Sequence, residues 1–267
     1  MGRTIAVANQ KGGVGKSTTA INLSACLAEQ GKKVLTIDMD PQGNTTSGLG
    51  VDKNAVEDTL YELLVGQSDV ETTIVKDVVE NVDLIPSNVN LSGAEIELVG
   101  IDNKEYILKE ITDKVKDNYD YIIIDCPPSL NMLTINALAA ADTALIPVQA
   151  QYLSAKSLEQ LLQTVGKVRR QINPKLKIEG ILLTMTDSRT NYGKQIDSLI
   201  RQAYGSKIKV FGQTIPRSVR AAETSAAGKS IFQHDPKGKV AEAYHSLAKE
   251  VLADAEKRLK RSSERAR

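Results

Sequence analysis

The sequence predicts an α/β fold, a single doubly wound domain with a mainly parallel sheet flanked by helices. Short apolar runs rich in β-branched residues alternate with longer segments of helical period. Several of these runs are apolar at every position, as strands covered on both faces are. No linker, repeat or low-complexity tract interrupts the alternation, so we expect residues 1–267 to form one domain.

Six strands and six helices are expected from this pattern. The strands are expected at residues 4–8, 34–37, 82–85, 121–124, 144–148 and 178–183. The helices are expected at residues 17–30, 104–115, 134–141, 154–172, 195–204 and 239 to about 259. The first helix stops at Gly31, a residue type that often ends helices. Residues 256–267 are highly charged with almost no apolar side chain, so we expect this segment to fray.

The amino-acid composition excludes several classes of protein. Hydrophobic residues make up 41% of the 267 residues, enough to build a sizeable core. No apolar run approaches the roughly 18 residues that a membrane span needs, and no leader precedes the first strand. We therefore expect a soluble, cytoplasmic protein with no membrane partner. Only Cys26 and Cys126 are present, and they form no CxxC motif, so we expect two buried, inert thiols.

Charge is distributed unevenly along the chain, although 34 Lys and Arg nearly balance 33 Asp and Glu. Residues 38–125 hold 20 acidic and 6 basic residues, net −14, whereas residues 167–220 hold 12 basic and 3 acidic residues, net +9. The basic segment suggests a polyanionic partner. The alternative is that the two segments neutralise each other across one fold. With no Trp and only 2 Phe, stacking on nucleic-acid bases is disfavoured, and contact with the phosphates of a duplex backbone is the better interpretation.

A glycine-rich loop between the first strand and the first helix is the strongest motif. It consists of Lys11, Gly12, Gly13, Val14, Gly15, Lys16, Ser17 and Thr18. Glycines let the backbone approach phosphate oxygens, the helix N-terminus offers N–H groups, and Lys16 reaches the β and γ phosphates. Ser17 is expected to hold Mg²⁺. The loop departs from the pattern G-x-x-x-x-G-K-[ST], because Gln10 stands where the first glycine belongs and Lys11 is an additional lysine.

Three aspartates follow predicted strands. Asp125 ends an apolar strand, where a carboxylate beside the phosphate loop can hold Mg²⁺ through water; the alternative is a capping residue. Asp38 and Asp40 end another strand close to the expected γ-phosphate. For both of them, a structural turn before Pro41 is the competing interpretation.

These motifs resemble those of the deviant Walker A ATPases, and among them the ParA/Soj-type partitioning ATPases. The resemblance covers nearly the whole chain and is carried by residues 11–18, 38–44, 121–129 and 215–220. It implies a P-loop NTPase fold, ATP and Mg²⁺ as cofactors, and a homodimer that forms with ATP. In that dimer Lys11 reaches the phosphates held by the other subunit. The resemblance further implies that Asp40 orients the attacking water and that Asp38 supports the magnesium shell.

The resemblance also extends to the base, the DNA and a protein partner. It places Pro216 and Ser218 near adenine, although relatives often carry Asn at the second position and a Ser-Glu-Ala-Pro run where this chain has residues 222–227. It implies nonspecific DNA binding through Arg189 and Arg220, with the single solvated charge as the alternative for each. A ParB-like centromere-binding protein is implied as the stimulating partner, and the nucleoid as the location. No helix-turn-helix segment precedes the first strand, so operator binding is not expected.

Four alternatives share parts of this pattern. A MinD-like positioning ATPase needs a C-terminal amphipathic helix with bulky apolar residues, but after Leu252 only Leu259 qualifies. An iron–sulfur relative needs cysteines at a dimer interface. A tyrosine kinase of related fold needs a tyrosine cluster in its tail, and the last tyrosine is Tyr244. A nucleotide-binding scaffold without turnover is not distinguished by motif.

Overall fold

A seven-stranded sheet forms the centre of the computed structural model, which describes residues 2–150, 154–187 and 190–265. The strand order is β3-β4-β2-β5-β1-β6-β7, and every neighbouring pair is parallel except β3 with β4. The strands are β1 Arg3–Val7, β2 Val34–Asp38, β3 Val75–Val79, β4 Val82–Ile85, β5 Tyr121–Asp125, β6 Thr143–Gln149 and β7 Lys177–Thr184. The prediction of one doubly wound, mainly parallel α/β domain is confirmed.

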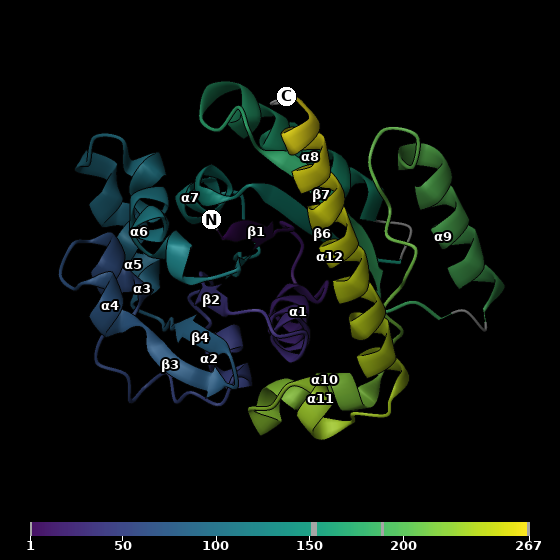
Figure 1. Ribbon diagram of the computed structural model, residues 1–267, viewed down its shortest axis with the longest axis horizontal. Coiled ribbons are helices and arrows are strands. Elements are labelled where there is room, and N and C mark those ends of the chain that lie inside the picture. The colour runs from purple at the N-terminus through teal and green to yellow at the C-terminus, as the bar shows by residue number, and fades with distance from the viewer. Residues whose placement is uncertain (1, 151–153, 188–189, 266–267) are drawn as a thin grey trace.

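Helices cover both faces of this sheet (Figure 1). The α-helices are α1 Lys16–Glu29, α2 Asn44–Gly48, α3 Leu60–Leu64, α4 Val70–Thr73, α5 Leu91–Glu97, α6 Ile107–Val115, α7 Met132–Ala140, α8 Ser154–Gln171, α9 Asn191–Tyr204, α10 Val219–Ala227, α11 Ile231–His234 and α12 Lys239–Arg265. The 3-10 helices are η1 Leu98–Gly100, η2 Lys104–Tyr106 and η3 Lys116–Asn118. On one face α1, α11 and α12 pack together, and on the other the core includes residues of α3 to α9.

Alternate residues of the central strands enter these two cores. In β5, Ile122 and Ile124 belong to the core shared with α6 to α8, whereas Ile123 belongs to the core shared with α1 and α12. All three side chains are fully buried. Because both faces of the sheet are covered, successive positions of such a strand are apolar, as Ile122 to Ile124 are, and the runs are therefore recognisable in the sequence.

Helix ends differ from the predicted ones for identifiable reasons. α9 begins at Asn191 because the Thr190 hydroxyl accepts a hydrogen bond from the Gly193 N–H at 3.0 Å and caps the helix. α7 begins at Met132 because the Asn131 side chain accepts from the Thr134 N–H at 3.3 Å. The predicted helix at residues 104–115 is divided into η2 and α6.

α12 extends to Arg265, beyond the predicted end near residue 259, so most of the charged C-terminal segment is helical in the structure. Helix ends open and close in solution, so the fraying of residues 256–267 stays a prediction. None of the helices in the described parts of the chain combines the length and apolar character that crossing a membrane requires.

Strand β3 was not predicted. It forms the edge of the sheet, pairs antiparallel with β4, and leaves Lys76 and Asp77 exposed. Asp77 also adopts a left-handed backbone conformation, with φ 50°. A short edge strand with an interrupted ladder carries neither the continuous apolar run nor the clean alternation that identifies strands.

The register of the central strands brings the predicted site together. Val7 of β1 and Asp38 of β2 both lie level with Asp125 of β5. The chain therefore leaves three neighbouring strands at the same edge of the sheet. The glycine-rich loop follows the first of these strands, so it lies beside both aspartates.

Candidate active site

The glycine-rich loop connects β1 directly to α1, as predicted. Gly13 and Gly15 have φ values of 70° and 85°, in the left-handed region that side chains with a Cβ rarely adopt. Gly15 is also the N-cap residue of α1. The loop can therefore turn its backbone N–H groups and the helix N-terminus toward a bound anion.

Side chains from neighbouring strands hold this loop in place. Asn9 donates from Nδ2 to the Pro147 carbonyl oxygen at 2.7 Å, and its Oδ1 accepts from the Lys11 N–H at 3.0 Å. The Thr184 hydroxyl, at the end of β7, donates to the Val14 carbonyl oxygen at 2.8 Å. Neither Asn9 nor Thr184 was predicted as part of the site. Asn9 lies just before the motif in sequence, whereas only the sheet order brings Thr184 next to it.

Lys16 is the first residue of α1, and only 6% of it is exposed. Its Nζ donates to the Lys11 carbonyl oxygen at 3.3 Å. Burial lowers the pKa of the Lys16 ammonium, and the nearby Asp125 opposes that shift. A buried cation with one long hydrogen bond gains strongly from a phosphate group placed beside it.

Asp38 and Asp125 form a buried carboxylate pair on adjacent strands. Both are fully buried. Burial, and then repulsion by Asp125, raises the pKa of Asp38 to about 8. Burial also raises the pKa of Asp125 to about 6, although hydrogen bonding by Ser17 and Thr45 and the charge of Lys16 oppose this. Two carboxylates held this closely cannot both ionise cheaply without additional positive charge.

Asp38 fastens the loop that follows β2. Its Oδ2 accepts from the Thr46 N–H and the Thr46 hydroxyl, both at 2.7 Å. Its Oδ1 accepts from the Asp40 N–H at 3.2 Å. Because both oxygens are engaged with this loop, the structure supports an anchoring role behind the metal site. Direct ligation of Mg²⁺ by Asp38 stays a prediction.

Asp125 and Ser17 fit a Mg²⁺ ion better. Asp125 Oδ2 accepts from the Thr45 hydroxyl at 2.7 Å, whereas its Oδ1 is buried and has no hydrogen-bond partner among the described residues. The hydroxyl of Ser17, the second residue of α1, lies near enough to this carboxylate to lower its pKa. Mg²⁺ prefers oxygen ligands of these two kinds. The orphaned buried oxygen is what a cation at this position would satisfy.

Asp40 lies at the start of the same loop, with 6% of the residue exposed. Its Oδ1 accepts from the Gln42 N–H at 3.0 Å, and its carbonyl oxygen accepts from the Ser87 hydroxyl at 2.9 Å. The turn before Pro41 is thus real, and it holds the carboxylate near Lys16, whose pKa the Asp40 charge raises. The structural and the functional interpretations of Asp40 are compatible.

The predicted adenine segment lies beside the chain that leaves β7, although α9 separates the two in sequence. The Arg217 N–H donates to the Thr186 carbonyl oxygen at 3.1 Å, and Pro216 forms an isolated parallel bridge with Thr186. The Ser218 hydroxyl caps α10 by accepting from the Ala221 N–H at 3.4 Å. Pro216 and Ser218 therefore lie at the same edge of the sheet as the phosphate loop. Their contact with a base stays a prediction.

Of the two predicted DNA-binding arginines, the structure describes only Arg220. Arg189 lies outside the described residues. Arg220 lies on α10, where its side chain is 65% exposed and forms an ion pair with Asp235 at 3.3 Å. Such an exposed pair contributes little to stability, so the guanidinium remains available to another anion.

Comparison with known proteins agrees with this geometry. A family model described as an AAA domain matches residues 2–178. The sporulation initiation inhibitor protein Soj of Bacillus subtilis is 52% identical over 254 residues, which cover 95% of this chain and 100% of Soj. The chromosome partitioning protein ParA of Myxococcus xanthus is 45% identical and is covered over 88% of its length, with 94% of this chain.

Solved structures share the fold over nearly the whole chain. The cobyrinic acid a,c-diamide synthase of Mycobacterium smegmatis, with bound ATP analogue and magnesium, has a TM-score of 0.83 and 36% identity, covering 93% of each chain. A McdA variant of Cyanothece in complex with ATP has a TM-score of 0.84 and 27% identity, covering 94% of this chain and 96% of that one. The cell division ATPase MinD of Pyrococcus furiosus has a TM-score of 0.77 and 27% identity, covering 95% and 99%.

We expect Lys16→Ala to weaken nucleotide binding by at least about a hundredfold, because it removes a charge-assisted hydrogen bond to phosphate. Isothermal titration with ATP and Mg²⁺ measures the change in affinity, and circular dichroism checks that the fold is retained. Lys175→Ala, at an exposed lysine before β7, is the control. Unchanged affinity in a folded Lys16→Ala protein would refute the assignment of the phosphate loop.

We expect the free energy of unfolding of the nucleotide-free protein to fall as the pH rises from about 5 to 8. Carboxyl groups in the unfolded chain titrate near pH 4, whereas the raised pKa values keep Asp38 and Asp125 protonated to higher pH in the folded state. Between these pH values the folded chain binds more protons than the unfolded chain does. Each such additional proton lowers the free energy of unfolding by up to about 1.4 kcal/mol per pH unit as the pH rises.

Asp38→Asn should make this decline shallower, because the amide does not titrate. Urea unfolding in EDTA at several pH values measures the slope. Asp102→Asn changes an exposed carboxylate and should leave the slope as in the parent. Equal slopes in the parent and in Asp38→Asn would show that the buried pair is ionised without cost.

Proposed function

The chain belongs to the ParA/Soj family of partitioning ATPases, and we propose that it partitions a chromosome or plasmid through an ATP-dependent dimer that binds DNA. Its chemistry is the Mg²⁺-dependent hydrolysis of ATP to ADP and phosphate. The observation that carries the proposal is the presence of two lysines on one phosphate loop with different partners. Lys16 Nζ donates to a loop carbonyl oxygen, whereas Lys11 Nζ lies 3.4 Å from Gln149 Oε1 at the end of β6.

Phosphoryl transfer depends mainly on positioning and on neutralising the charge of the phosphates. Backbone N–H groups of residues 12–17 would hold the phosphate oxygens, and Lys16 would neutralise charge on the β and γ phosphates. Ser17 and Asp125 would hold Mg²⁺, which supplies positive charge to the same oxygens when bound. Asp40 would orient the attacking water, and Asp38 would keep the Asp40–Thr46 loop in place through its three hydrogen bonds.

The additional lysine, Lys11, would make dimerisation depend on bound ATP. Lys16 already serves the phosphates within its own subunit, so a second cation from the same loop would be redundant there. A partner subunit facing this edge of the sheet would instead receive Lys11 at its own phosphates. Hydrolysis would then remove the charge that Lys11 contacts and would loosen the dimer.

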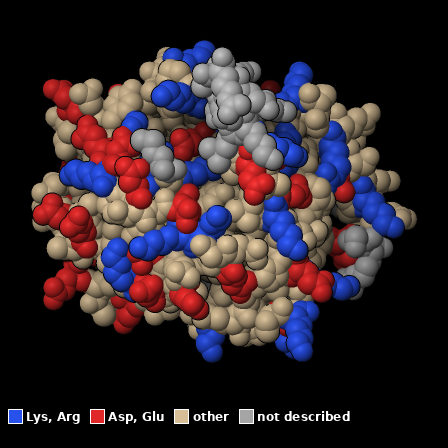
Figure 2. Space-filling view, viewed as in Figure 1, with Lys and Arg blue, Asp and Glu red and all other residues tan. Residues whose placement is uncertain are grey.

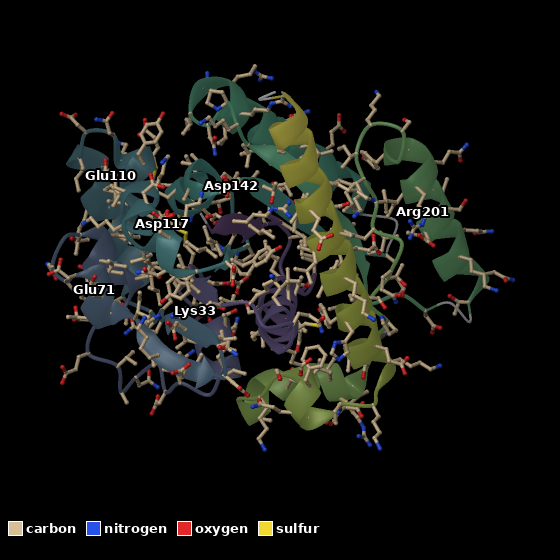
Figure 3. All side chains as sticks on the ribbon, in the orientation of Figure 1. Lys33, Glu71, Glu110, Asp117, Asp142 and Arg201 are labelled. Carbon is tan, nitrogen blue, oxygen red and sulfur yellow. The ribbon has the colours of Figure 1, made fainter. Side chains whose placement is uncertain are left out.

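Surface charge supports DNA binding. In Figure 2 acidic side chains are dense on the left, over α3 to α6, and basic side chains follow the right edge near α9 and the lower edge near α10 and α11. Figure 3 places Glu71 and Glu110 on the acidic side and Arg201 on α9 at the opposite side. These labelled acidic and basic residues thus lie on opposite sides of the molecule, which favours a basic surface over mutual neutralisation of the two segments. A dimer would present two such basic surfaces jointly.

We further propose that a ParB-like protein stimulates hydrolysis and that DNA binding locates the protein on the nucleoid. The identity of 52% to Soj and 45% to a ParA favours this function over that of MinD, whose solved structure is 27% identical.

We expect Asp40→Ala and Lys11→Ala to fail at different steps. Asp40→Ala should bind ATP and dimerise, but its turnover should fall by at least about a hundredfold because the water is no longer oriented. Lys11→Ala should bind ATP within one subunit and remain monomeric because its loop no longer reaches the phosphates of the other subunit. Light scattering after gel filtration with ATP measures the oligomeric state, and phosphate release measures turnover. Together they distinguish the two variants. Identical oligomeric state and turnover in both variants would argue against a dimer in which Lys11 reaches the phosphates of the other subunit.

We expect the double change Arg189→Glu with Arg220→Glu to abolish DNA binding but spare ATP-dependent dimerisation. Removal of one interaction with a DNA phosphate should lower the log–log salt slope by about 0.9 on duplex DNA. Binding to random-sequence duplex across a salt series measures this, after light scattering has confirmed the dimer.

The matched control reverses two lysines on the acidic side, Lys109 and Lys114 of α6, to glutamate. It changes the net charge by the same amount but should retain the salt slope. Equally weakened binding in both double variants would mean that overall charge, rather than this surface, governs DNA binding.

A further inference from the structure

A second group of potential ligands lies on the face of α1 that packs against α12. Cys26 and Glu29 belong to α1, and His245 belongs to α12. Cys26 Sγ lies 3.0 Å from His245 Nδ1, and that nitrogen lies 3.7 Å from Glu29 Oε2. One ligand atom from each residue lies within 4.8 Å of the other two. Three different metal-ligating side chains therefore converge although one of them is more than 200 residues away in sequence.

The local structure explains why they converge. Cys26 and Glu29 are three residues apart on a helix, so they lie on the same face. α12 crosses this face, and its Tyr244 hydroxyl is 3.2 Å from the Thr19 hydroxyl of α1. The His245 ring also contacts the Phe232 ring of α11, with centroids 4.6 Å apart and planes tilted by 49°. The imidazole is thus held from two sides while it faces the cysteine.

The chemistry of the three ligand atoms favours one class of ion. Thiolate sulfur and imidazole nitrogen select Zn²⁺ and similar transition metals, whereas Mg²⁺ is bound through oxygen. Ligand atoms around a tetrahedral Zn²⁺ lie roughly 3.3–3.7 Å apart, given bond lengths of about 2.0–2.3 Å. The observed separations need only small side-chain adjustments to reach that geometry. The side chains of His245 and Glu29 are 37% and 45% exposed, so an ion can enter from solvent.

We propose that Cys26, Glu29 and His245 bind a divalent transition-metal ion of the Zn²⁺ class, with water completing the coordination. The site is separate from the nucleotide site, because Cys26 lies ten residues after Lys16, about 15 Å along α1. Binding replaces the thiol proton, which is released to solvent, and leaves a thiolate on the metal.

Without a metal the thiol stays protonated. Burial and the Glu29 carboxylate raise the pKa of Cys26 to about 12, while the Lys249 ammonium opposes this. The competing interpretation is a simple hydrogen bond between Cys26 and His245. A bound ion would differ from that hydrogen bond because it would deprotonate Cys26 at neutral pH and fasten α12 to α1 more strongly.

The test uses the full chain, treated with EDTA and freed of nucleotide, and titrated with Co²⁺ as a spectroscopic probe. We expect about one equivalent to produce a near-ultraviolet thiolate–cobalt charge-transfer band that Zn²⁺ abolishes by displacement. Cys26→Ser should remove the band. Glu29→Gln, at an exposed position that does not endanger folding, should weaken Zn²⁺ binding by at least about tenfold.

His234→Asn is the matched control, because His234 also lies beside a glutamate, at 3.3 Å from Glu223, but has no role in this site. It should keep the band and the affinity. Cys126→Ser separates the two thiols and should also keep the band. Absence of a thiolate band, or a band that survives in Cys26→Ser, would overturn the proposal and leave only the hydrogen bond.

Discussion

The site depends on one constraint, the register that places Asp38 and Asp125 level with each other on adjacent buried strands. Their burial beside Lys16 makes a negative charge on either carboxylate costly, because water cannot screen it. The protein compensates in part, since Asp38 accepts three hydrogen bonds from the segment after β2, and hydrogen bonding by Ser17 and Thr45 stabilises the Asp125 carboxylate. Within the part of the chain that the structure describes, the buried Oδ1 of Asp125 has no hydrogen-bond partner, and it lies next to the place where the loop would put a phosphate-bound cation.

This register links the binding of nucleotide and Mg²⁺ to the ordering of the segment that follows β2. The hydrogen bonds that hold Asp38 are also those that fix Asp40 and Thr46, so the same carboxylate connects the strand to the group that would position water. A cation that satisfies Asp125 lowers the cost of keeping Asp38 ionised, and an ionised Asp38 accepts those hydrogen bonds more strongly. The nucleotide and its metal would therefore stabilise the loop without touching Asp38. The groups that bind phosphate and the group that would position water are therefore joined in one network of charges and hydrogen bonds.

Much of the fold and of the phosphate site could be predicted because the signals for both are local. Strands covered on both faces are continuous apolar runs, and the loop with its two lysines is contiguous in sequence. Edge strand β3 was missed because it is half exposed and irregular. Thr45 and Thr184 were missed because only the strand order brings them to Asp125 and to the loop. Asn9 and Thr46 lie close in sequence to the groups they contact, but the sequence pattern does not distinguish common polar residues with such a role. Cys26 is buried, as expected, but nothing in the sequence connects it to His245.

Helix α1 carries residues of both the nucleotide site and the proposed metal site. Its first turn carries Lys16 and Ser17, while its last turns carry Cys26 and Glu29. Two consecutive residues of α12 contact it at both levels, Tyr244 at Thr19 and His245 at Cys26. A helix packed in this way moves as a rigid element, so an ion that fixes α12 to its far end also restricts its first turn. If that restriction changes nucleotide affinity, then nucleotide must change metal affinity by the same factor, because coupling between two binding sites is reciprocal.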